Sequence, residues 1–138
     1  MCDKLFRHYI IVQTTGPRFK RGSLWPKKRK LPEKTHSVYV IELKPKVLEQ
    51  HPKFVKANPN HDPAKACFYV GMTSKTPEER FEQHLKGYKA NKYARDFGKF
   101  LCDELFCHYN PMTRQEAEDR EVALAELLRK QGHAVWQN

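Results

Sequence analysis

The alternation of hydrophobic and polar positions predicts two short strands in the middle of the chain. In residues 37–43, SVYVIEL, apolar side chains fall on both sides of an extended backbone, as in a strand that is buried on both faces. Residues 68–70, Phe-Tyr-Val, are aromatic and β-branched, which favours a packed strand. Gly71 ends this second strand, at a point where a backbone without Cβ can turn or approach another group closely.

Two Thr-x-x-Glu sequences predict the starts of two helices. Thr76 is expected to be an N-cap, with Pro77 at the first helical position and a glutamate three residues after the threonine. Thr113 begins a second sequence of the same kind. The two helices are expected to end at Gly87 and Gly132, because glycine readily leaves the helical conformation.

An apolar stripe on each of these helices indicates the face that is buried. The predicted stripes are Phe81, Leu85 and Tyr88 on the first helix, and Ala117, Leu124, Ala125 and Leu128 on the last. Glu121 lies within the last stripe, where an unpaired carboxylate is costly. An internal salt bridge and a role as metal ligand both satisfy such a group.

The rest of the chain is predicted from weaker patterns. We expect a strand within residues 4–15, a helix over 92–105, a third strand over 105–109 and a short final strand at 134–137. Residues 44–66 form a long connection with four prolines and one or two helical turns. A connection of this length inside a compact domain is usually functional or an insertion.

The composition indicates one basic domain with a moderate core. The chain has 138 residues, 39% of them hydrophobic, and a net charge of +10. Such a charge favours binding to a polyanion, most commonly nucleic acid, with an acidic membrane surface as the alternative. There is no apolar run of about 20 residues that would span a membrane, and the N-terminus is a poor signal peptide, so we expect a cytoplasmic protein.

Residues 17–35 form a basic segment without hydrophobic periodicity, which we call the arm. We expect it to contact a nucleic-acid backbone through counterion release, with a solvated basic loop as the alternative. Trp25 is a candidate either for stacking on a base or for packing the arm against the body. The candidate nucleic-acid-binding residues are Trp25, Lys27, Lys28, Arg29, Lys30, Lys86, Lys89 and Lys92.

Arg80 and His84 are four residues apart on the helix that starts at Thr76, and they therefore share one face. The planar guanidinium of arginine suits phosphate oxygens, so the pair is a candidate lining for a cleft. The alternative is a surface arginine beside a half-buried histidine. The helix pattern by itself leaves both interpretations open.

The order of these features resembles the GIY-YIG nuclease family. Tyr39 corresponds to the tyrosine of the first motif, whose other two positions differ here, and residues 69–71 correspond to the second motif. Arg80 and His84 follow at family-like spacing. Glu121 ends a block that resembles the E-A-x-x-x-E of the family, whose second glutamate binds metal.

The resemblance covers residues 37–135 and implies an α+β fold with a small, mainly antiparallel, three-stranded sheet flanked by helices. It implies a nuclease domain in residues 36–138, which leaves the expected N-terminal strand and the basic arm in residues 1–35. Residues 44–66 are an insertion, because this connection is about three times the usual family length.

The resemblance also implies hydrolysis of phosphodiester bonds in DNA with one divalent ion, Mg²⁺ or Mn²⁺, bound by Glu121. Arg80 would stabilise the charge of the transition state, and Tyr39 is the candidate general base. Tyr69 and His84 would orient water or phosphate, with His84 as the alternative base. The alternative function is a non-catalytic basic nucleic-acid-binding domain on the same fold.

Overall fold

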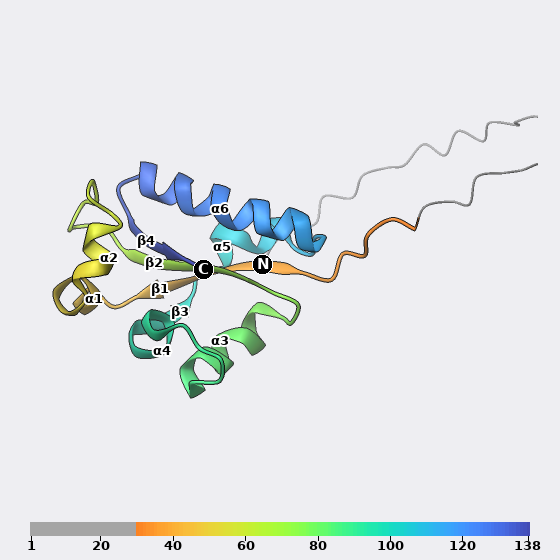
Figure 1. The fold of residues 1–138 in the computed structure, drawn as a ribbon, viewed down its shortest axis with the longest axis horizontal. Helices are drawn as coiled ribbons and strands as arrows, with labels where there is room; N and C mark the ends of the chain where they lie inside the picture. The colour runs from red at the N-terminus through yellow and green to blue at the C-terminus, as the bar shows by residue number, and fades with distance from the viewer. Residues whose placement is uncertain (1–29) are drawn as a thin grey trace, which may run out of the picture. The chain divides into compact units, whose positions relative to one another are not determined.

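The computed structural model describes residues 30–138, of which Glu33–Asn138 form a compact unit. This unit is built on a four-stranded mixed sheet with the strand order β3-β1-β2-β4 (Figure 1). β1 pairs antiparallel with both β2 and β3, whereas β4 runs parallel to β2. The strands are β1 (Ser37–Leu43), β2 (Cys67–Thr73), β3 (Gly98–Leu101) and β4 (Ala134–Gln137).

Helices cover both faces of the sheet. α3 and α4 lie against one face, α5 and α6 lie against the other, and α1 and α2 sit at one end (Figure 1). The helices are α1 (Lys46–Gln50), α2 (Pro52–Lys56), α3 (Pro77–Lys86), α4 (Lys92–Phe97), α5 (Asp103–Phe106) and α6 (Arg114–Lys130), with a 3₁₀ turn η1 at Cys107–Tyr109. None of the helices within residues 30–138 combines the length and apolarity that a membrane span requires.

β1 and β2 form the centre of the core, as their apolar sequences predict. Their antiparallel register places Tyr39 opposite Gly71. The long connection between them, residues 44–66, leaves this pairing intact and folds into α1 and α2, which confirms the expected helical turns. Val47 and Phe54 anchor the two short helices, because each is fully buried in the core.

The expectation of a three-stranded, mainly antiparallel sheet is wrong in detail. β4 adds a fourth strand, at the residues where the short final strand was expected, and it is parallel to β2. A parallel pair requires a long crossover connection. Here that connection contains α6, which packs on the sheet through the apolar stripe predicted from the sequence.

The third strand was predicted in the wrong place. Residues 105–109 form the end of α5 and the turn η1, and the strand is β3, which the helix over 92–105 was expected to include. α4 ends at Phe97 because Gly98, a poor helix former, takes an extended conformation. The open edge of β1 then supplies hydrogen-bonding groups that pair with β3.

The predicted apolar stripe of α3 is also wrong at two positions. Leu85 is 47% exposed and Tyr88 is 56% exposed, whereas His84 is fully buried. The Thr76 side chain caps the helix as expected, by accepting a hydrogen bond from the amide of Glu79. The helix ends at Gly87, whose left-handed backbone, with φ of 81°, diverts the chain before Tyr88 can continue the stripe.

Candidate active site

The site begins with the close approach of two strands at Tyr39 and Gly71. Tyr39 is fully buried on β1, and Gly71 is its partner on β2. A Cβ on Gly71 would lie 2.5 Å from the hydroxyl oxygen of Tyr39, which is too close for any side chain. Glycine at this position therefore creates the space that the Tyr39 ring occupies.

His84 of α3 holds the Tyr39 hydroxyl. The Nε2 atom of His84 lies 2.8 Å from this oxygen, and Nδ1 accepts a hydrogen bond from the amide of Asn91 at 3.2 Å. Because Nδ1 accepts, the proton of the neutral ring is on Nε2, which donates to Tyr39. Burial, followed by the charge of Arg80, lowers the pKa of His84 to about 4, so the ring is neutral at pH 7.

Tyr69 completes a cluster of three rings. Its ring centroid lies 6.1 Å from that of Tyr39 and 5.3 Å from that of His84. Its buried hydroxyl has no hydrogen-bond partner among residues 30–138. Burial raises the pKa of Tyr39 to about 12, an effect that the charge of Arg80 opposes, and burial also raises the pKa of Tyr69. Both phenols are therefore protonated in the free protein.

Arg80 is held by the turn that follows its own helix. Nη1 donates to Gln83 Oε1 at 3.1 Å and to the Tyr88 carbonyl at 3.3 Å, and Nη2 donates to the Lys89 carbonyl at 2.8 Å. Among residues 30–138, these bonds use three of the five N–H donors of the guanidinium, and the other two can serve another acceptor.

Arg80 also lines an open cavity of about 340 Å³. Four of the lining side chains are cationic and none is acidic, which suits a phosphate group. Of the cationic four, Arg114 is paired with Glu118 at 3.2 Å. The lining residues are His36, Met72, Thr73, Ser74, Lys75, Arg80, Gln83, Tyr88, Lys89 and Arg114.

Glu121 lies where the helical pattern predicts, on the buried face of α6, and is only 5% exposed. Burial raises the pKa of Glu121 to about 7, and a hydrogen bond with the main chain of Asn138 opposes this shift. Besides burial, the negative charge of Glu121 raises the pKa of both Tyr39 and Tyr69, so the carboxyl is close enough to interact electrostatically with the ring cluster. No salt bridge of Glu121 occurs within the part of the chain that the structure describes.

A divalent ion fits these residues if Glu121 is its single protein ligand. Residues 30–138 contain no group of three or more His, Cys, Asp or Glu side chains arranged around a common point. Mg²⁺ tolerates such a site, because it commonly keeps several waters and takes one or two carboxylates together with substrate phosphate oxygens. A buried carboxyl without a cation partner matches this ligand requirement.

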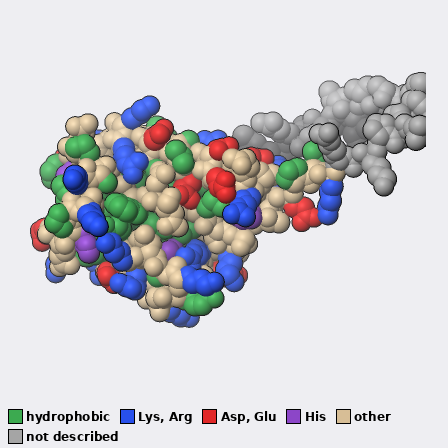
Figure 2. All heavy atoms as spheres, in the orientation of Figure 1, with side chains coloured by type: hydrophobic (Ala, Val, Ile, Leu, Met, Phe, Trp, Pro, Cys, Tyr) green, Lys and Arg blue, Asp and Glu red, His purple; other side chains and the backbone are tan. Residues whose placement is uncertain are grey.

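The predicted nucleic-acid-binding residues fall into two groups. Trp25, Lys27, Lys28 and Arg29, like most of the arm and the strand expected in residues 4–15, lie outside the described residues. The other four lysines are exposed, and Lys and Arg side chains gather over α3 and α4 while acidic side chains concentrate over α6 (Figure 2). These four are Lys30, Lys86, Lys89 and Lys92, of which Lys89 lines the cavity beside Arg80 and Lys92 covers the Tyr93 ring.

Several residues of the site were missed by the sequence analysis. Asn91 caps α4 with its side chain, and its amide also sets the tautomer of His84. Lys75 and Arg114 belong to different elements, and only the fold brings them to the cavity of Arg80. Lys75 lies two residues after the end of β2 and directly before the cap of α3, a position from which a contact with substrate could have been inferred.

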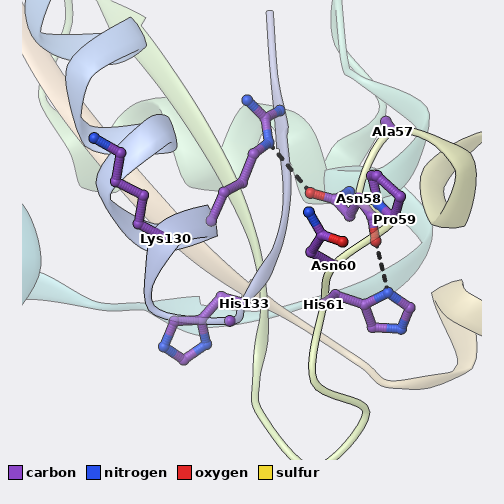
Figure 3. Close-up of a pocket in the computed structure, with 9 residues that line it drawn as sticks. Ala57, Asn58, Pro59, Asn60, His61, Lys130 and His133 are labelled. Carbon is purple, nitrogen blue, oxygen red and sulfur yellow. Dashed lines mark hydrogen bonds between the residues drawn. The ribbon is translucent and has the colours of Figure 1, made fainter.

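A second cavity, of about 350 Å³, lies at the C-terminal end of α6 and contains none of the predicted catalytic residues (Figure 3). Asn58 of the insertion is buried there, and it donates to Phe54 O and accepts from Val135 N and Arg129 Nε. We call this arrangement the Asn58 junction. The cavity is lined by Ala57, Asn58, Pro59, Asn60, His61, Arg129, Lys130, Gly132 and His133.

The comparison with protein families agrees with the geometry of the site. The family model of the GIY-YIG catalytic domain matches residues 36–134, which is most of the chain. The chain therefore belongs to the GIY-YIG family, whose members are nucleases acting on nucleic acids. Neither a curated protein nor a solved structure matches the chain.

Proposed function

We propose that this chain is a metal-dependent endonuclease that hydrolyses phosphodiester bonds in DNA. The observation that carries the proposal is the 2.8 Å hydrogen bond between Tyr39 and a neutral, buried His84. A binding surface does not require a buried tyrosine that is oriented by a histidine of fixed tautomer. A general base does require this, because its oxygen must be held at a defined position.

Tyr39 would accept the proton of the attacking water. Its pKa of about 12 in the free protein means that the phenol must first release its own proton to solvent, which the positive charges of the metal and of Arg80 would make easier. The Nε2–H of His84 and the charge of Arg80 both stabilise the phenolate. Because Nε2 already carries a proton in this tautomer, His84 cannot accept one from Tyr39 there, which favours Tyr39 over His84 as the base.

Arg80 would stabilise the phosphate during attack. As water adds to phosphorus and the bond to the leaving oxygen breaks, negative charge grows on the non-bridging oxygens. The two N–H groups of Arg80 that are not used in these three bonds among residues 30–138 would serve those oxygens. Its three bonds to Gln83, Tyr88 and Lys89 hold the guanidinium before substrate arrives, which reduces reorganisation during the reaction.

Glu121 would be the ligand of the divalent ion, with water and phosphate oxygens as the remaining ligands. When bound, Mg²⁺ or Mn²⁺ supplies positive charge for the phosphate and the leaving oxygen. Tyr69 would support the same region, because its buried hydroxyl has no hydrogen-bond partner among residues 30–138 and could bond to a water or a phosphate oxygen.

The test is incubation of the protein with labelled single-stranded, duplex and branched DNA in Mg²⁺, in Mn²⁺ and in EDTA. We expect internal cleavage of at least one substrate with either ion and none in EDTA. Binding of all substrates without cleavage under any condition would contradict the proposal and favour a non-catalytic domain. RNA of the same sequence provides the comparison that defines the substrate.

A further inference from the structure

The turn after α3 presents an aromatic side chain to solvent. Gly87 N–H bonds to His84 O and Tyr88 N–H bonds to Gln83 O, which is the Schellman arrangement at a helix end. In this motif the residue at the position of Tyr88 often packs back onto the helix through an apolar contact. Here Tyr88 is 56% exposed, and the helical residue it would meet is the polar Gln83.

Tyr88 lines a cavity that is rich in cationic side chains. Tyr88 lines the same cavity as Arg80, Lys75, Lys89 and Arg114. The Lys89 ammonium lies 5.6 Å from the centroid of the Tyr88 ring. At about 340 Å³ the cavity is near the lower end of the 300–1,000 Å³ typical of small-ligand sites, which suits one nucleotide rather than a duplex.

We propose that Tyr88 stacks on an unpaired base of the nucleotide next to the scissile phosphate, so that this cleft takes a single-stranded stretch of DNA. The proposal rests on the proposed nuclease function, because it places the phosphate of that nucleotide at Arg80. A base within a duplex has both faces covered by its neighbours, whereas an unpaired base offers a face to an aromatic ring. The surrounding cations contact the backbone on either side.

The same turn connects base binding to the catalytic arginine. Arg80 donates to the carbonyls of Tyr88 and Lys89, at 3.3 Å and 2.8 Å, so the main chain that carries the stacking ring also holds the guanidinium. A base stacked on Tyr88 would therefore immobilise the turn to which Arg80 is bonded. Single-stranded DNA would in this way both bind at the cleft and stabilise the position of Arg80.

The decisive experiment measures binding in EDTA, where cleavage does not interfere, with three fluorescein-labelled probes of equal length. The probes are an oligothymidylate, a chain of abasic deoxyribose phosphates and a hairpin duplex. The variants are Tyr88→Ala, Tyr88→Phe and, as a matched control, Leu85→Ala. Leu85 lies at the end of α3, three residues before Tyr88, is exposed to a similar extent and does not line the cavity.

We expect Tyr88→Ala to weaken binding of the oligothymidylate by roughly 5- to 150-fold, the range that one aromatic–base stack provides. Binding of the abasic chain and of the hairpin duplex should be unchanged. Tyr88→Phe should retain most of the affinity because the ring is kept, and Leu85→Ala should behave like the wild type.

An equal loss on the oligothymidylate and the abasic chain would overturn the proposal, since the ring would then act on the backbone or on the fold of the turn. No loss on the oligothymidylate would overturn it as well. The cleavage assay with metal is independent of these measurements. If the protein cleaves DNA but Tyr88→Ala binds the oligothymidylate as well as the wild type does, only the stacking is refuted. If binding follows the expected pattern but no DNA is cleaved, only the nuclease function is refuted.

Discussion

The ring cluster at Tyr39 and the Asn58 junction both bury polar side chains, but the two regions differ in whether those side chains are hydrogen-bonded. Asn58 is 3% exposed, and its amide group makes bonds to Phe54, Arg129 and Val135. In the ring cluster the Tyr69 hydroxyl is buried without a partner among the described residues. Nearby, Glu121 is buried with its pKa raised to about 7.

This difference distinguishes a structural polar group from one kept available for a ligand. A buried polar group that lacks a hydrogen bond costs roughly 1–3 kcal/mol, so the junction gains stability where the ring cluster loses it. The junction joins the insertion to α6 and β4, which explains why both the oxygen and the nitrogen of the Asn58 amide are hydrogen-bonded. The ring cluster retains unused hydrogen-bonding capacity beside Arg80, where a phosphate and a water would use it.

The largest effect is expected for Glu121→Gln. If the buried carboxylate is the only protein ligand of the ion, this variant should lose cleavage while fold and DNA affinity remain largely intact. Steady-state cleavage in Mg²⁺ and binding in EDTA, measured on the same preparation, test this. Cleavage at close to the wild-type rate would show that Glu121 does not bind the metal ion. The contrast between the ring cluster and the Asn58 junction would then have no support from Glu121.

Arg80→Ala should lower kcat by about 10²–10³-fold, the usual cost of removing one transition-state donor. The effect on KM should be much smaller, because the cavity keeps Lys75, Lys89 and Arg114 for phosphate contact. Single-turnover cleavage and binding measurements separate the two quantities. If only affinity changes, Arg80 positions the substrate. Arg80→Lys is the companion variant, and it should rescue little because it cannot maintain all three bonds of the guanidinium.

Asn58→Ala should destabilise the fold by about 3 kcal/mol, because it leaves buried partners in β4 and α6 without their acceptor. Urea unfolding followed by circular dichroism measures this free energy of unfolding. The rate per folded molecule should stay unchanged. Asn60→Ala is the matched control, since Asn60 lines the same cavity and is exposed. Equal effects of the two variants would show that Asn58 does not act through its buried bonds.

Tyr69→Phe should have the opposite effect to Asn58→Ala, because it should change the rate and not the stability. We expect a free energy of unfolding within about 0.5 kcal/mol of the wild type and cleavage slower by about 10- to 100-fold. The hydroxyl has no partner to lose within the described residues, while one hydrogen bond to a charged group is worth about 1.5–3 kcal/mol in the reacting complex. Tyr93→Phe is a close control, because the Tyr93 hydroxyl is also buried without a partner there but lies outside the site. A similar loss of rate in both variants would contradict the role of Tyr69.

The smallest effect concerns the pH dependence of stability. The pKa of His84 is about 4 when folded and about 6.5 when unfolded, so between these values the unfolded chain binds more protons. The contribution of His84 is therefore complete above pH 6.5 and is lost as the pH falls toward 4. His84→Gln should remove this dependence, seen as up to one proton fewer taken up on unfolding. If the stability of the wild type and of His84→Gln depended on pH in the same way, a group other than His84 would cause the dependence.

Local patterns in the sequence were sufficient where the structure depends on neighbouring residues. The caps at Thr76 and Thr113 and the stop at Gly87 form within one helical turn, and the structure confirms each of them. The stripe of α6, with Glu121 inside it, follows from helical periodicity and is also confirmed. The same reasoning misplaced β3, because that strand depends on the edge of β1 and not on its own residues.

The sequence by itself therefore determined most of the elements, though not β3, together with the buried position of Glu121 and the family to which the chain belongs, since these depend on short-range patterns and on motif order. Tertiary structure decided the rest. Only the register of β1 and β2 places Tyr39 on Gly71, and only the packing of α3 buries His84 in place of Leu85. The amide of Asn91 sets the tautomer of His84, and burial together with the charge of Arg80 sets its pKa, because hydrogen-bond partners and burial are properties of the folded protein.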